Sequence, residues 1–446
     1  MMAGPAGRII TERRQPGRVA YVNARLLDPA TGLDDKGALL TDGEMVLDFG
    51  PGLFHDGVPS TIEVVDCHGA CLAPGLVDMR VQLREPGEEH KETLRTAGEA
   101  AVAGGVTAMV CLPNTDPVID DVAAVEFVAR RARLIGLAKV YPYAAATRSL
   151  EGRELAEIGL LRQAGAIAFT DGLQAIADAR MMRRVLAYAA TFDAMIVQHP
   201  EEPSLAAGGM MNEGETATRL GLAGIPIAAE AIMLERDMRL VELTGARYHA
   251  AHLSTAAGAE IVRQAKARGL NVTADTAPPY FALNELAVGD WRTFAKLSPP
   301  LRAEGDRRAI VAAIADGTID VIASDHAPQD QDSKRQPFAQ AACGGVGLET
   351  LLPVTLELVH NSHLSLLKAI EHLTWAPAKL LGLPAGRLKA GAAADLVLFD
   401  PDRGWKVEPE SQFHSKSKNS PFDGRLVQGK VLRTVVDGRC VYLADG

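Results

Sequence analysis

The sequence has few cysteines and no paired cysteine motif. Its cysteines, Cys67, Cys71, Cys111, Cys343 and Cys440, number five and are scattered without CxxC spacing. A disulfide framework needs an even set of cysteines, and a zinc finger needs closely paired ones, so the pattern excludes both. We therefore expect a protein of the reducing cytoplasm.

Long apolar runs and basic clusters are also lacking. The best apolar stretch, residues 100–112, contains two glycines and is shorter than the ~18 residues that a membrane span needs. Acidic residues number 56 against 46 basic ones, which gives a net charge of −10 and argues against nucleic acid, because phosphate binding needs a basic face. The sequence predicts no membrane and no nucleic acid as partner, and favours a small molecule or a protein.

The two ends of the chain resemble each other and differ from its middle. Residues 18–75 and 394–444 consist of short β-type runs separated by turns, whereas apolar runs alternate with helix-period segments from about 73 to 382. Eight such runs are candidate barrel strands: 75–83, 107–112, 139–145, 166–169, 194–198, 247–251, 271–275 and 320–323. We expect an α/β protein with a (β/α)8 TIM barrel at 73–382 and a small β-sandwich built from residues 1–72 and 383–446.

Four residues that could bind a metal each follow one of these runs. They are Asp171, His199, His252 and Asp325. Any one of them alone is more often structural, because an Asp before a helix is commonly an N-cap and a single strand-end histidine is commonly packed. Their joint placement at the carboxyl ends of barrel strands, where catalytic groups gather, predicts a site for a divalent metal.

Several motifs together resemble dihydroorotase of the amidohydrolase superfamily. They span nearly the whole chain: PGLVDM at 74–79, LREPG at 83–87, LPNT at 112–115, NEGE at 212–215, HLST at 252–255, PPLR at 299–302 and SDHAP at 324–328. The resemblance implies a metal-dependent hydrolase barrel that opens a cyclic amide, with dihydroorotate as the substrate and N-carbamoyl-aspartate as the product.

The resemblance also implies roles for individual side chains around that substrate. Arg84 and Asn114 would hold the carboxylate of dihydroorotate, which suits a guanidinium fork and an amide donor. His326 would contact the edge of the ring, and Asp325 would be the catalytic group that transfers the proton of the attacking hydroxide.

The implied metal ligands are Asp171, His199, His252 and Asp325. Related hydantoinases and allantoinases commonly use a carboxylated lysine as the bridge between two metals, but residues 156–172 contain no lysine. Asp171 would bridge the metals instead, with His199 and His252 completing one of the two positions.

The main departure from the family lies in the first predicted barrel strand. Active members carry a His-x-His pair where this chain reads Arg80-Val81-Gln82. Arginine has no lone pair to offer a metal, and glutamine offers only a weak oxygen ligand, so the site loses two imidazole ligands. Zinc remains possible at one position, held by Asp171, His199 and His252. If the protein is inactive, no cofactor is expected.

Two functions therefore remain open. The favoured one is a degenerate dihydroorotase-like protein of pyrimidine biosynthesis, similar to the inactive subunits that assemble with aspartate transcarbamoylase into an oligomer. The alternative is an active cyclic amidohydrolase that uses the reduced metal site. For the favoured function we expect the Arg80 guanidinium to lie over the lost metal position and to pair with Asp325, Asp171 or both. The competing expectation is that Arg80 turns to solvent.

Overall fold

The computed structural model describes residues 7–12 and 16–445. Its centre is a ring of parallel strand segments, which are β7 (Leu76–Val81), β8 (Val106–Cys111), β9 (Lys139–Pro142), the segment 166–169, β10 (Met195–Gln198), β13 (Arg247–Ala250), β14 (Val272–Thr276) and β15 (Val321–Ile322). Every ladder between neighbouring strands of the ring is parallel. Single parallel bridges, Ala144 to Phe169, Phe169 to Ile196 and Val81 to His326, join the remaining neighbours and close the ring. The predicted eight-stranded barrel is confirmed.

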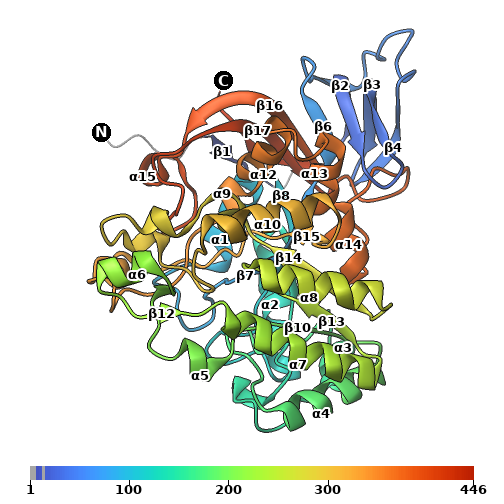
Figure 1. Ribbon diagram of the computed structural model, residues 1–446. Helices are drawn as coiled ribbons and strands as arrows, with labels where there is room; N and C mark the ends of the chain where they lie inside the picture. The colour runs from blue at the N-terminus through green and yellow to red at the C-terminus, as the bar shows by residue number, and fades with distance from the viewer. Residues whose placement is uncertain (1–6, 13–15, 446) are drawn as a thin grey trace.

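Helices follow the barrel strands along the chain and form the outer layer, with α7, α8 and α10 on the near side in Figure 1. In chain order they are α1 (Leu94–Ala103), α2 (Val122–Ile135), α3 (Ile158–Gln163), α4 (Ala179–Ala190), α7 (Ala228–Thr244), α8 (Ala256–Ala267), α10 (Glu304–Ala315), α12 (Leu351–His360), α13 (Leu366–Leu373) and α14 (Trp375–Leu381).

Short elements occur mostly in the loops beyond the carboxyl ends of the strands. They are α5 (Pro203–Ala206), β11 (Met211–Asn212), α6 (Glu215–Leu220), β12 (Gly224–Ile225), α9 (Pro278–Ala282), α11 (Gln331–Lys334) and α15 (Pro409–Gln412). Four 3-10 turns are found at Arg148–Leu150, Glu285–Val288, Thr293–Ala295 and Leu348–Thr350.

Strands from both ends of the chain pair in one nine-stranded sheet. The N-terminal strands are β1 (Arg8–Ile9), β2 (Arg18–Asp28), β3 (Leu33–Asp42), β4 (Met45–Gly50), β5 (Glu63–Asp66) and β6 (Cys71–Pro74), and the C-terminal ones are β16 (Leu396–Lys406), β17 (Leu426–Val436) and β18 (Arg439–Leu443). Their order is β1-β18-β17-β16-β6-β2-β3-β4, and β5 pairs with β2. In Figure 1 the blue strands β2 to β4 and the orange strands β16 and β17 lie together beside one end of the barrel.

The domain boundaries at 72/73 and 382/383 stay a prediction. Strand β6 spans the first of them and pairs with both β2 and β16, so it links the two parts of the chain. Residues 1–6 and 13–15 of the predicted N-terminal part, and residue 446 at the other end, lie outside the described residues.

Local sequence explains where the site-bearing elements begin and end. Every residue of β7 is buried, as expected for a strand covered on both faces. Helix α2 begins where the Asp121 carboxylate accepts a hydrogen bond from the Ala124 N–H, and it ends at Gly136 in the left-handed conformation. Helix α8 begins at Thr255, whose hydroxyl accepts from the Gly258 N–H. These caps fix the loops that leave the carboxyl ends of the strands.

Among residues 7–12 and 16–445, no helix is both long enough and apolar enough to cross a membrane.

Candidate functional site

The first and last barrel strands bring Arg80 and Asp325 together. Val81 and His326 form a parallel bridge, and the Gln82 N–H donates to the His326 carbonyl at 2.9 Å. Across this junction Arg80 Nε donates to Asp325 Oδ1 at 2.9 Å. Arg80 is only 2% exposed, so its side chain does not turn to solvent. The expected pairing of Arg80 with a site carboxylate is confirmed for Asp325.

The Arg80–Asp325 ion pair lies in a poorly hydrated environment. Burial raises the pKa of Asp325, although the Arg80 charge and its hydrogen bond act in the opposite direction. The Arg80 Nη1 and Nη2 atoms are buried and make no hydrogen bond to the described residues. A fixed guanidinium charge therefore lies among the residues predicted to bind a metal dication.

Beneath this pair, Asp78 fixes the backbone of both strands. Its Oδ1 accepts from the N–H groups of Arg80 and Ser324, each at 3.1 Å. Burial raises the pKa of Asp78 to about 6, and these hydrogen bonds act in the opposite direction. Asp78 thus holds β7 and the segment after β15 in the register that lets Arg80 reach Asp325.

His199 and His252 meet at the ends of β10 and β13. His199 Nδ1 lies 2.9 Å from His252 Nε2, and the two rings stack with centroids 4.9 Å apart. Burial holds the pKa of His252 well below its ordinary range, and the charges of Arg80, His199 and His249 lower it further. His252 is therefore neutral at physiological pH.

Asp171 is held by Thr147, which lies in the loop that follows β9. Its two carboxylate oxygens accept hydrogen bonds from the Thr147 N–H, at 2.9 Å, and from the Thr147 hydroxyl. Burial raises the pKa of Asp171 to about 6, and the Thr147 contacts lower it in part. Arg80 pairs with Asp325 and not with Asp171.

The predicted ligands do not form one metal-binding cluster. Among the residues that the structure describes, no group of three His, Cys, Asp or Glu side chains is arranged to hold an ion. His199 and His252 converge, but Asp171 is bound to Thr147 and Asp325 is bound to Arg80. As placed, these side chains do not fit a zinc ion.

The three predicted substrate-binding residues all have partners within the chain. Arg84 donates from Nη1 to Glu88 at 2.7 Å and from Nε to the Pro328 carbonyl at 3.2 Å. Asn114 Nδ2 donates to Gln82 Oε1 at 3.3 Å. Gln82, which stands where active members have the second histidine of the His-x-His pair, therefore contacts the side chain that was predicted to bind the substrate carboxylate.

His326 is 1% exposed and lies among internal partners. Its Nδ1 accepts from the Gly347 N–H at 3.2 Å, and its Nε2 is 3.5 Å from Glu92. The roles of Arg84, Asn114 and His326 toward a substrate stay predictions.

His249 and Asp275 support the histidine pair and were not identified from the sequence. Asp275 Oδ1 accepts from the His252 N–H, and Asp275 Oδ2 lies 3.0 Å from His249 Nε2. The other ring nitrogen of His249 contacts the Thr273 hydroxyl at 2.8 Å. No motif surrounds His249. The available signal was the position of Asp275 at the end of a predicted strand.

A second supporting group, Glu230 of α7, holds the loop after His252. Its carboxylate accepts from the backbone N–H and the hydroxyl of both Ser254 and Thr255. Arg302 also donates to the Ser254 hydroxyl at 3.1 Å, and to Asn212 at 3.2 Å. The motifs at 212–215, 252–255 and 299–302 therefore contact one another at the loop that follows His252.

The depressed pKa of His252 predicts a pH dependence of stability. The unfolded chain binds a proton at His252 near pH 6.5, whereas the folded chain does not. This contribution to stability is present above that pH and is lost as the pH falls toward the folded-state pKa. The free energy of unfolding should therefore drop more steeply in the wild type than in His252→Gln, by up to about 1.4 kcal/mol per pH unit below 6.5.

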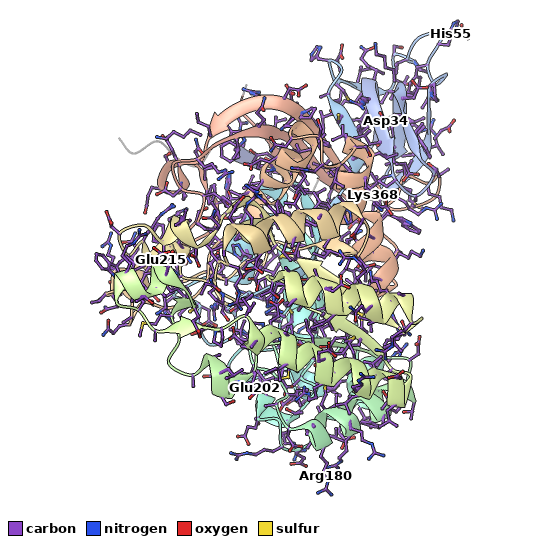
Figure 2. The ribbon with its side chains drawn as sticks, in the orientation of Figure 1. Asp34, His55, Arg180, Glu202, Glu215 and Lys368 are labelled. Carbon is purple, nitrogen blue, oxygen red and sulfur yellow. The ribbon has the colours of Figure 1, made fainter. Side chains whose placement is uncertain are left out.

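Urea unfolding at several pH values from 7.5 to 5 measures this difference. His55→Gln is the matched control, because the His55 side chain is 90% exposed at the tip of the N-terminal strands in Figure 2. Parallel pH profiles for the wild type and His252→Gln would show that His252 is not held neutral by the fold.

Comparisons with known proteins agree with this architecture. The family model "Dihydro-orotase-like" matches residues 69–257, and an amidohydrolase family model matches residues 302–442. The chain is similar to a protein named dihydroorotase from Anaplasma phagocytophilum, at 48% identity over 430 residues that cover 96% of each chain. It is also similar to a protein named dihydroorotase from Wolbachia sp. subsp. Brugia malayi, at 45% identity, with 95% of this chain and 96% of that chain covered.

Among solved structures, L-hydantoinase (dihydropyrimidinase) from Arthrobacter aurescens superposes with a TM-score of 0.85 at 26% identity, covering 96% of both chains.

Proposed function

We propose that this chain, which belongs to the dihydroorotase family within the amidohydrolases, is a dihydroorotase-like protein of pyrimidine biosynthesis that lacks dihydroorotase turnover and acts as a structural subunit. The observation that supports this most is the buried ion pair between Arg80 and Asp325. It engages the predicted catalytic carboxylate and puts a permanent cation where metal ligands are expected.

Three further contacts support the loss of activity. Asp171 is bound to Thr147, Asn114 donates to Gln82, and Arg84 is paired with Glu88. Asp171 would be needed to bind the metal, and Asn114 and Arg84 would be needed to bind the substrate carboxylate during ring opening. Amidohydrolases generally depend on a metal to supply a nucleophile at neutral pH, and the residues present do not assemble its ligands.

An assay of dihydroorotate hydrolysis tests the proposal. The purified chain, with and without added zinc, should form no N-carbamoyl-aspartate above the rate of a protein-free control. Turnover that is removed by a chelator and restored by zinc would contradict the proposal.

Two observations favour the active alternative with a reduced metal site. The His199 and His252 nitrogens converge at 2.9 Å, and relatives at 48% and 45% identity carry the name dihydroorotase. This alternative requires Asp171 to join the two histidines as a metal ligand while Thr147 holds its carboxylate, as ligating carboxylates are commonly hydrogen-bonded. Zinc-dependent turnover with one zinc per chain would support it.

The proposal includes aspartate transcarbamoylase as the partner, which the resemblance in sequence supports. The tagged chain, purified from its own cell, should bring this enzyme with it, and the two should elute together as one large species. A monomeric chain with unassisted turnover would contradict the partnership. The proposal also includes a cytoplasmic location, which the five free thiols support.

A further inference from the structure

A hollow lies beside helix α2, on the outside of the barrel. Its volume is about 790 Å³. The loops after β7 and β8 contribute Pro86, Pro117 and Ile119 to its wall, and α2 contributes Phe127 and Arg130. The hollow is distinct from the Arg80–Asp325 pair, which lies inside the ring of strands.

The outward face of α2 exposes apolar side chains that the fold does not use. The helix buries Val125, Val128 and Ala132 against the barrel. Val122 and Phe127 point outward and are 40% and 37% exposed, and Leu160 on the adjacent α3 is 55% exposed. Phe127 lies near the middle of the helix, where an aromatic anchor of an interface would be expected.

Charge is divided along the same helix. The N-cap Asp121 and Glu126 lie at its first half, and Arg130, Arg131 and Arg133 lie in its second half, where Arg131 pairs with Glu85. Glu126, Arg130 and Arg133 are exposed and form no ion pair with another described residue. A helix with an acidic first half and a basic second half is complementary to a second copy of itself lying antiparallel.

We propose that the outward face of α2 pairs with α2 of a second copy of this chain about a twofold axis. With the axis crossing the outward face at the height of Val128 along the helix, Glu126 lies opposite Arg130 of the partner subunit, because each is two residues, or about 3 Å, from that height. Arg133 of the partner subunit comes within one helical turn of Asp121. Phe127 is one residue from the axis and lies beside the partner's Phe127 at the same edge of the helix pair.

A second copy explains this face better than an unrelated protein does. In a twofold interface the same surface patch faces itself, so a helix that pairs with its own copy carries both the acidic and the basic member of each ion pair. Helix α2 carries both, with its acidic residues in one half and its basic residues in the other. This inference does not depend on the proposed function, because it concerns no residue of the barrel interior.

Sedimentation velocity of the purified full-length chain over a range of concentrations tests the pairing. We expect a dimer whose dissociation constant rises about tenfold or more in Glu126→Arg and in Arg130→Glu, since each change puts like charges together twice. The variant that combines Glu126→Arg with Arg130→Glu should restore the wild-type constant. Phe127→Ala should weaken the dimer as well.

Two changes on α7 are matched controls. Glu235→Arg reverses an exposed charge and Leu243→Ala removes a side chain that is 62% exposed, and neither should alter association. The proposal is overturned if the wild type is monomeric at every concentration, if the single variants associate like the wild type, or if the combined variant is no better than either single one.

Discussion

Replacing Arg80 by alanine is expected to lower the free energy of unfolding by about 3–5 kcal/mol, as measured by chemical denaturation. The change removes the partner of Asp325 and leaves a carboxylate in a site where burial already raises its pKa. The loss is large because an unpaired buried charge has neither water nor a counterion to stabilise it.

The chain provides a matched control for this variant. Arg18 Nε also pairs with an aspartate carboxylate oxygen, Asp42 Oδ2, at the same 2.9 Å distance, but these side chains are 56% and 45% exposed. Arg18→Ala should cost at most about 1 kcal/mol. The double variant Arg80→Ala with Asp325→Ala should be destabilised less than the sum of the two single changes, because neither charge is then left alone. If Arg80→Ala and Arg18→Ala have equal effects, the buried pair does not have the role assigned to it.

The second large effect is a gain of metal binding. Arg80→His combined with Gln82→His should convert a chain that retains no zinc into one that retains at least one equivalent. The double change removes the cation, frees Asp325 and adds two imidazoles beside the existing pair, His199 and His252. Because a single supporting contact alters metal affinity by roughly 10–100-fold, two added ligands should have a larger effect.

Elemental analysis after equilibration with zinc and removal of free metal measures the gain. Arg80→Ala is the control that removes the guanidinium without adding a ligand, and it should retain no zinc. If the double histidine variant binds no more zinc than Arg80→Ala, the loss of the two histidines is not what prevents metal binding.

The sequence predicted the parts of the site that depend on strand order. The apolar runs identified the eight barrel segments, and residues that follow such runs meet at one edge of a parallel barrel. His199 and His252 therefore converge as expected. The pairing of Arg80 with Asp325 followed from charge, because a carboxylate left without a metal requires a nearby cation.

Other contacts depend on loop paths and registers that no short pattern encodes. Asp171 turns to Thr147, which follows β9, because that loop presents both an N–H and a hydroxyl to it. His249 reaches Asp275 only through the register of β13 and β14. Glu230 lies on the buried side of α7. The helix contains several acidic residues, and nothing in the sequence distinguishes Glu230 from the others.

The zinc content of the wild-type chain tests the central claim most directly. The chain is purified without chelators, equilibrated with excess zinc, separated from free metal and then analysed for zinc per chain. We predict no retained zinc, because the Arg80 guanidinium holds Asp325 and the described side chains form no group of three metal ligands. One equivalent would favour the reduced metal site instead, and two equivalents would contradict the claim that Arg80 has replaced the metal centre.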